Sequence, residues 1–239
     1  MRPQKPSFER PLLTVDVVIF GVAAERLNVL LVKRAEAPFR GRWALPGGFV
    51  NVALDCDLES VAKRKLFDKT GVAAPYLEQF GTVGDARRDP RGWSATTVYF
   101  ALIDATTARL VKGGNTEEVA WHPVERLPRT LAFDHAELCD GVLARFRSKV
   151  EYTSLPAHLL PEKFTLPDLQ RMYEIVLGRP VDKASFRRRM LDAGFLGVVP
   201  GGTRQDAKKP AQLFRTKPGA RLAYFPRTFR SAEQAALRS

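Results

Sequence analysis

The segment PGGFVNVALDCDLESVAKRKLFDKTGV, residues 46–72, constrains the fold more than any other part of the chain. It opens with two consecutive glycines, which permit a tight turn. Behind the turn, apolar residues repeat at helical spacing (i, i+3, i+4, i+8): Leu58, Val61, Ala62 and Leu66. Asp57 stands directly before them and is a suitable N-cap. The segment therefore predicts an amphipathic helix that follows a Gly-Gly turn.

The same segment resembles the Nudix box, G-x5-E-x7-R-E-U-x-E-E-x-G-U, in which U is a bulky aliphatic residue. The glutamates of that box lie on one helix face and bind divalent metals, which polarise a pyrophosphate and activate water. Two stretches strengthen the resemblance, W-A-L-P-G-G-F-V before the helix and R-x-L-x-D-x-T-G-V within and after it. An amphipathic helix alone would not distinguish a Nudix protein from any other protein with a helix after a Gly-Gly turn.

The acidic positions of the box are altered in this chain. Alignment on Gly71 puts Arg64 at the motif arginine and Cys56 at the upstream glutamate. The three acidic positions on the helix are occupied by Lys65, Asp68 and Lys69. The interval from Gly48 to Gly71 is also longer than in the box. An ammonium group cannot bind Mg²⁺, and two lysines would repel it, so we expect a Nudix scaffold with neither a metal site nor hydrolase activity.

The rest of residues 1–150 alternates strands and helices. Apolar, β-branched runs predict strands at 12–20, 27–33, 95–103 and 118–124. Apolar residues at helical spacing predict a helix at 133–150. This order suits the α/β/α sandwich with a mixed sheet that is typical of Nudix proteins.

The pattern changes after residue 150. Residues 151–163 contain two prolines and are predicted to connect the first domain, 1–150, to a second one at 164–230. In the second domain, Thr165 is a natural N-cap, and Gly178 ends the helix that follows. The predicted apolar stripe of this helix comprises Leu169, Met172, Tyr173, Val176 and Leu177.

A second, cationic helix is predicted after a turn that contains Pro180, with Asp182 as its N-cap. Its expected inner face comprises Phe186, Met190 and Leu191. Its other faces carry Lys183, Ser185, Arg187, Arg188 and Arg189. Two helices joined in this way predict a helix-turn-helix. Residues 197–225 predict a β-hairpin wing whose basic loop carries Arg204, Lys208 and Lys209, so the domain is expected to be a winged helix.

Charge supports this division of the chain. Residues 151–239 contain 16 Lys and Arg against 8 Asp and Glu, whereas residues 1–150 contain 22 against 18. A small and strongly basic domain favours a polyanion partner.

The two cysteines, Cys56 and Cys139, lack metal-ligand spacing and cannot form a disulfide framework. The first eleven residues lack the apolar run of a signal peptide. We therefore expect a cytoplasmic protein.

Over nearly its whole length, the chain resembles the Nudix-related transcriptional regulators of NAD metabolism, the NrtR-type repressors. The most specific segments are WALPGGFV, RDPRG, LAFDHAE, FTLPDLQRMYE and LGRPVDKASFRR. The resemblance implies a homodimeric repressor that binds a palindromic DNA operator, controls NAD biosynthesis or salvage genes, and is released by ADP-ribose or a related nucleotide. ADP-ribose would then be an effector, and no cofactor would be required.

Such an effector needs fixed cations for its pyrophosphate and an apolar or aromatic clamp. The resemblance places Arg88, Asp89 and Arg91, of the loop RDPRG, near the effector. The further expected contacts are Arg34, Arg42, Phe49, Arg64 and Lys65. We further expect Lys65, with help from Lys69, to neutralise part of the charge that Mg²⁺ neutralises in the hydrolases. The alternative for RDPRG is a solvated, charged turn.

Two other functions remain open from the sequence. The first is an active ADP-ribose pyrophosphatase with a nucleic-acid-binding C-terminal domain, which would need carboxylates where Lys65 and Lys69 stand. The second is an RNA-associated Nudix protein, which is disfavoured because no aromatic stacking platform accompanies the basic residues. A regulator that senses another nucleotide or sugar phosphate is also compatible with the chain.

Overall fold

The computed structural model describes residues 10–73, 76–205, 210–219 and 222–226. The N-terminal part of this region is built on a mixed sheet with strands β1 (Leu12–Ala23), β2 (Arg26–Arg34), β3 (Trp43–Ala44), β4 (Gly47–Phe49), β5 (Tyr76–Asp85), β6 (Ser94–Leu102) and β7 (Thr116–Pro123). The four strands predicted from the sequence are present as β1, β2, β6 and β7, with bounds that differ by one to three residues at their ends. Strands β3, β4 and β5 were not predicted.

The central path of the sheet runs β3-β2-β1-β6-β5, with β4 paired to β1 and β7 to β2. Strands β1 and β6 run parallel, from Leu12 opposite Ser94 to Phe20 opposite Leu102. The other pairs of this sheet are antiparallel. This arrangement confirms the predicted mixed sheet.

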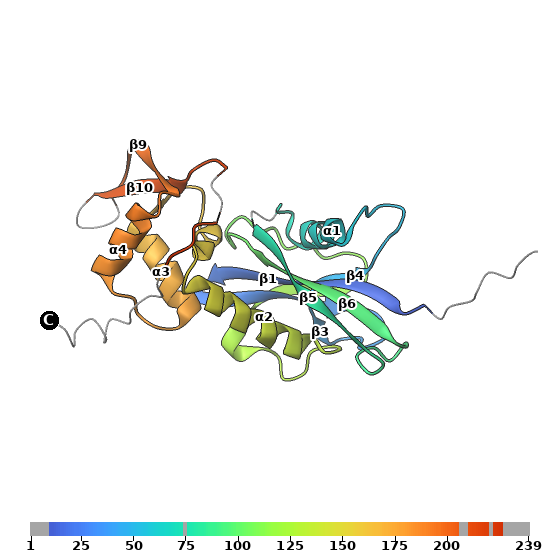
Figure 1. Ribbon diagram of the computed structural model, residues 1–239. Helices are drawn as coiled ribbons and strands as arrows, with labels where there is room; N and C mark the ends of the chain where they lie inside the picture. Colours follow the sequence, from blue (N-terminus) through green and yellow to red (C-terminus); the bar gives the residue numbers. More distant parts are fainter. Residues whose placement is uncertain (1–9, 74–75, 206–209, 220–221, 227–239) are drawn as a thin grey trace, which may run out of the picture.

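One helix covers each face of the sheet, α1 (Leu58–Thr70) above it and α2 (His135–Val150) below it in Figure 1. Successive residues of β1 face the two helical layers alternately. Val17 and Ile19 pack with α1, whereas Val18 and Phe20 pack with α2. The alternation of side chains along a strand thus produces the predicted α/β/α sandwich.

Helix α1 begins where the sequence predicts. The Asp57 carboxylate accepts the Ser60 backbone N–H at 2.6 Å, and the Ser60 hydroxyl accepts the Asp57 N–H in return at 3.1 Å. Three of its predicted apolar residues are fully buried, and the fourth is partly buried: Val61, Ala62 and Leu66, then Leu58. The helix ends at Gly71, whose φ of 65° favours glycine.

The C-terminal part is a winged helix, which lies at one end of the sandwich (Figure 1). It contains β8 (Phe164–Thr165), α3 (Leu166–Leu177), α4 (Lys183–Asp192), β9 (Leu196–Arg204) and β10 (Ala211–Thr216). The strands form a second sheet in the order β8-β10-β9. Thr165 and Asp182 cap α3 and α4, and Gly178 ends α3 with a φ of 68°, as predicted.

One prediction for α4 was wrong. Phe186 and Met190 are buried, but Leu191 is 44% exposed. Leu191 immediately follows Met190, so it is rotated about 100° away from it around the helix axis. The buried stripe of this short helix is therefore narrower than the hydrophobic residues suggested.

Residues 151–163, predicted to connect the two domains, are packed against the core. They contain the 3₁₀ helix η2 (Leu155–Leu159), in which Leu155 and Leu159 are buried. The same apolar cluster includes Phe20 of the sheet, Phe146 of α2 and Tyr173 of α3. The sandwich and the winged helix are thus joined by one continuous core. Among the described residues, no helix is long and apolar enough to cross a membrane.

Candidate ligand cleft and nucleic-acid interface

A cleft of about 830 Å³ opens beside α1, between the Gly-Gly turn and the loops on either side of it. Its lining is rich in cations: Arg34, Arg64, Lys65, Lys69, Arg88, Arg91 and Lys112. Three carboxylates also line it: Asp16, Asp68 and Asp89. A cleft of this size with a positive lining suits a small, anionic ligand.

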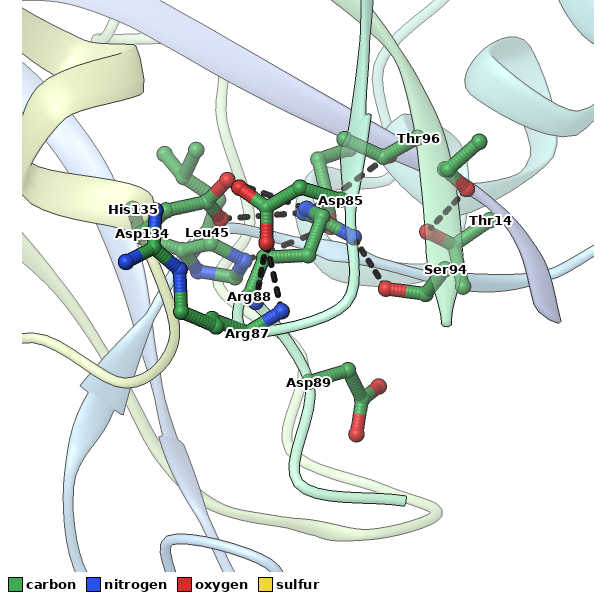
Figure 2. Close-up of polar contacts among 12 residues, drawn as sticks. Thr14, Leu45, Asp85, Arg87, Arg88, Asp89, Ser94, Thr96, Asp134 and His135 are labelled. Carbon is green, nitrogen blue, oxygen red and sulfur yellow. Dashed lines mark hydrogen bonds and ion pairs between the residues drawn. The ribbon is translucent and has the colours of Figure 1, made fainter. Parts of the chain in front are cut away.

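A buried polar cluster fixes the floor of the cleft (Figure 2). Arg88 donates two hydrogen bonds to the Asp134 carboxylate, from Nε at 3.0 Å and from Nη2 at 2.9 Å. Its Nη1 reaches the Ser94 hydroxyl at 3.2 Å, and Nη2 lies 3.6 Å from Asp16. The Arg88 side chain is only 4% exposed, so these groups satisfy a charge that burial would otherwise penalise.

His135, at the start of α2, completes this cluster. Its Nδ1 accepts the Leu45 backbone N–H at 2.8 Å, which leaves the proton of the neutral ring on Nε2. Burial lowers the pKa of His135, although Asp16 opposes that shift. Gly47 packs directly on Asp16, since a Cβ at this position would lie 2.0 Å from the Asp16 Oδ1 atom. The Gly-Gly turn is therefore required for close approach at this point.

Aromatic rings form a second wall. The Arg91 guanidinium lies 4.9 Å from the centre of the Phe49 ring and 5.9 Å from that of Phe133. Its Nε and Nη2 also bond the Asp89 carboxylate at 3.0 and 2.7 Å. Arg34 lies 5.0 Å over the Phe133 ring. Phe133 has a φ of 54°, a strained value for a non-glycine residue.

The lysines of α1 have different environments. A Cβ at Gly48 would lie 2.9 Å from the Lys65 Nζ, so this ammonium is pressed against the Gly-Gly turn. Burial, and then the charge of Arg64, lower the pKa of Lys65. Lys69 instead donates to the Gly113 carbonyl and the Thr116 hydroxyl, at 3.0 and 2.8 Å. Lys69 thus holds a neighbouring loop, which limits its availability to a ligand.

Arg64 is likewise committed to a partner within the protein. Its Nε and Nη2 donate to the Asp55 carboxylate at 2.7 and 2.5 Å. These bonds hold the pKa of Asp55 at about 2. Cys56, which occupies the first acidic position of the box, is exposed and does not line the cleft. Among the described residues, no group of three His, Cys, Asp or Glu side chains is placed to hold a metal ion.

The structure brings seven of the eight predicted effector contacts to the cleft: Arg34, Phe49, Arg64, Lys65, Arg88, Asp89 and Arg91. Arg42 is not in the lining, and its guanidinium lies 5.5 Å over the Phe39 ring. Sequence reasoning did not assign Phe133 and His135, although both belong to the segment LAFDHAE that was singled out. It also missed Lys112, which no motif marks.

The exposed face of α4 is the candidate nucleic-acid interface. Lys183, Arg187 and Arg188 are exposed, and they form no ion pair with any residue that the structure describes. Ser185 is half-buried, and its backbone N–H bonds the Asp182 cap at 2.8 Å. Three exposed cations on the second helix of a helix-turn-helix suit contact with a polyanion.

Two other cations of the winged helix that the sequence singled out contact other groups of the protein. Arg189 is half-buried, with its guanidinium 5.5 Å from the centre of the Phe225 ring. Arg204 bonds both oxygens of Asp168 at 2.8 and 2.7 Å, and so ties β9 to the start of α3. Lys208 and Lys209, the predicted wing lysines, lie outside the described residues.

The fold and these two sites define a Nudix-like domain joined to a DNA-binding type of winged helix. Residues 11–141 match the model of the NUDIX domain, and residues 156–216 match that of the NrtR DNA-binding winged helix domain. The ADPR responsive transcriptional repressor NtrR of Acinetobacter baylyi is 45% identical over 213 residues, which cover 89% of this chain and 84% of that protein. The chain belongs to the NrtR family.

Two crystal structures of Shewanella oneidensis NrtR are similar to this chain. The complex with a 27mer DNA has a TM-score of 0.82 at 40% identity and covers 91% of this chain and 99% of that chain. The NUDIX domain complexed with ADP ribose has a TM-score of 0.54 at 43% identity and covers 58% of this chain and 90% of that chain. The similarity therefore covers both the Nudix domain and the winged helix.

Proposed function

We propose that this protein is a transcriptional repressor that binds operator DNA through its winged helix and is released by ADP-ribose or a related nucleotide. The effector would bind in the cleft beside α1. The proposal rests on one observation: a cation-lined cleft and a helix α4 with exposed cations share one continuous core. The similarity to an ADPR responsive repressor supports the same conclusion.

The cleft offers groups that match each part of ADP-ribose. Lys65 and Arg34 supply positive charge for the pyrophosphate, while the Phe133 ring offers an apolar face to the adenine. Asp89 could accept hydrogen bonds from ribose hydroxyls. Because Arg88 and Arg91 are already held by carboxylates, the cleft is largely organised before a ligand arrives.

We propose that the cleft binds this ligand without hydrolysing it. Hydrolysis in Nudix enzymes needs carboxylates that hold metal ions. Here Lys65 lies against the Gly-Gly turn and Lys69 holds the loop at Gly113, so ammonium groups occupy the positions of two such carboxylates. Incubation with ADP-ribose and Mg²⁺, followed by detection of AMP, separates this proposal from the pyrophosphatase alternative.

We further propose a homodimer that acts in the cytoplasm on a palindromic operator upstream of NAD biosynthesis or salvage genes. A two-fold dimer presents two recognition helices to half-sites about one DNA turn apart. Lys183, Arg187 and Arg188 on α4 would make the first contacts, joined by Ser185 and by the wing lysines Lys208 and Lys209.

A gel-shift experiment tests the proposal. The purified protein is mixed with DNA from upstream of its own gene and of the neighbouring genes, with and without ADP-ribose. We expect one or more fragments to be retarded, and ADP-ribose to release them. Retardation that ADP-ribose does not alter would contradict the effector assignment, and the absence of any specific shift would contradict the assignment as a repressor.

A further inference from the structure

Helix α2 has its first turn at the ligand cleft and its last turn beside α3 of the winged helix (Figure 1). We propose that α2 transmits occupancy of the cleft to the recognition helix, with Arg147 and Glu151 as positioning residues at its far end. This inference rests on the proposed function, because it requires that a ligand in the cleft changes the affinity for DNA.

The cleft end of α2 is bound to the groups that a ligand would touch. Asp134, the N-cap residue, holds Arg88 through two hydrogen bonds of 3.0 and 2.9 Å (Figure 2). His135 lines the cleft and is bonded to the Leu45 N–H at 2.8 Å. Phe133, which lies immediately before the N-cap, also lines the cleft. A ligand that engages Arg88 or Phe133 therefore acts directly on the start of α2.

The far end of α2 is bound to the helix-turn-helix. Arg147 donates from Nε to the Val176 carbonyl at 2.9 Å. That carbonyl lies in the last turn of α3, where a helix leaves its carbonyl groups without internal partners. Glu151, the C-cap residue, accepts hydrogen bonds of 2.8 and 3.0 Å from Arg179. Arg179 stands in the turn that leads into α4, so the far end of α2 helps to set the position of the recognition helix.

The body of α2 is stiff enough to link these two ends. It contains 16 residues, which corresponds to a length of about 24 Å at the usual rise of an α-helix. One side is pressed against the sheet, where Phe146 stacks on Phe20 with ring centres 5.3 Å apart. A shift or rotation at the first turn would therefore reach the last turn as a rigid movement, because the continuous backbone hydrogen bonds oppose local bending.

A second contact between the two domains provides a matched control. Glu25, in the turn between β1 and β2, accepts from Arg171 of α3 at 2.6 Å. Like the pair of Glu151 and Arg179, it is an ion pair between the sandwich and the helix-turn-helix. It does not involve α2, and neither of its residues lines the cleft. Loss of this pair should weaken the contact between the two domains but leave the proposed transmission through α2 intact.

The experiment measures a coupling factor for the full chain, defined as the ratio of DNA dissociation constants with and without saturating ADP-ribose. The DNA is the fragment that the wild-type protein retards. For the wild type, the factor should lie at roughly 5–150. In Glu151→Gln and Arg147→Met it should fall to within about twofold of 1, whereas Glu25→Gln should keep the wild-type factor. Because the factor is a ratio, a variant that merely weakens DNA binding does not change it.

The affinity for ADP-ribose in the absence of DNA serves as the second measurement. It should stay near the wild-type value in Glu151→Gln, because Glu151 does not line the cleft. The double variant with Glu151→Arg and Arg179→Glu, which reverses the ion pair, should regain coupling. The proposal is overturned if Glu151→Gln and Arg147→Met retain the wild-type factor, or if Glu25→Gln loses it to the same extent. A wild-type factor of 1 would instead overturn the proposed function, and this inference with it.

Discussion

The cations of the cleft beside α1 and those of helix α4 are held in opposite ways. In and beside the cleft, three arginines are each bonded to an aspartate: Arg64 to Asp55, Arg88 to Asp134 and Arg91 to Asp89. On α4, three exposed cations form no ion pair with a described residue: Lys183, Arg187 and Arg188. The two sites thus contain similar cationic side chains, but those of the cleft are fixed by ion pairs and those of α4 are not.

This difference matches the kinds of ligand proposed for the two sites. A small nucleotide is bound selectively when the groups around it are ordered beforehand, because less side-chain entropy is lost on binding. A long polyanion offers many equivalent phosphates, and exposed, mobile cations can bind them with release of counterions. The affinity of α4 for DNA should therefore depend strongly on salt concentration. The affinity of the cleft for its ligand should depend on it less.

The largest effect is expected from Arg88→Met. This change leaves the carboxylates of Asp134 and Asp16 in or near the core without their cation. Breaking a buried ion pair from one side costs about 3–5 kcal/mol in the free energy of unfolding. Urea unfolding monitored by circular dichroism measures this cost. Arg187→Met, the matched change on α4, should lower the free energy of unfolding by less than about 0.5 kcal/mol. Equal losses of stability in the two variants would contradict the difference between the two sites.

Arg187→Ala should give the next largest effect, on DNA rather than on stability. A bidentate contact with guanine would make the loss of operator affinity about 1–3 kcal/mol, and a phosphate contact would make it smaller. Fluorescence anisotropy with labelled operator measures the affinity at several salt concentrations. Arg40→Ala, which removes an exposed arginine of the sandwich, is the control. If both variants bind the operator as the wild type does, α4 is not the recognition helix.

The Lys65 ammonium should replace part of the charge neutralisation that a metal supplies in hydrolases. ADP-ribose should therefore bind with unchanged affinity in EDTA. Lys65→Met should weaken binding by about 1.5–3 kcal/mol, the usual contribution of a hydrogen bond to a charged group. Isothermal titration calorimetry measures both. Lys63→Met is the control, because Lys63 is exposed on the same helix and pairs with Glu59. A strict requirement for Mg²⁺ would contradict this assignment.

The smallest effect concerns pH. Burial lowers the pKa of all three histidines, His122, His135 and His158. Below the ordinary histidine pKa of about 6.5, the unfolded chain therefore binds more protons than the folded one, and stability is lost as pH falls. His158→Phe removes one such group, whose ring lies 5.2 Å from that of Tyr76. The fall in urea midpoint between pH 7 and pH 5 should become shallower, and an unchanged slope would exclude His158 as a contributor.

The sequence predicts best those features that depend on neighbouring residues. The caps at Asp57, Thr165 and Asp182 were correct because each acceptor and its backbone donor lie within three residues. Strand β5 was missed because Gly81 and Gly84 interrupt its apolar pattern. Its pairing with β6, rather than its own composition, makes it a strand.

Contacts between distant segments could not be predicted from the residues alone. Arg88 was expected near the effector and does line the cleft, but its bonds to Asp134, 46 residues away in the sequence, were not expected. Arg204 was assigned to DNA as part of the basic loop of the wing, and its ion pair with Asp168 of α3 was not expected. In both cases the residue type indicated an anion partner correctly, and only the fold determines which anion is within reach.

A reciprocal titration measures the thermodynamic coupling proposed between the cleft and helix α4. The affinity for ADP-ribose is measured with and without saturating operator, and the affinity for operator with and without saturating ADP-ribose. Linkage requires both ratios to be equal, and we expect a coupling of about 1–3 kcal/mol in the direction of mutual weakening. Equal affinities in both pairs would show that the Nudix domain does not control DNA binding, and would contradict the account.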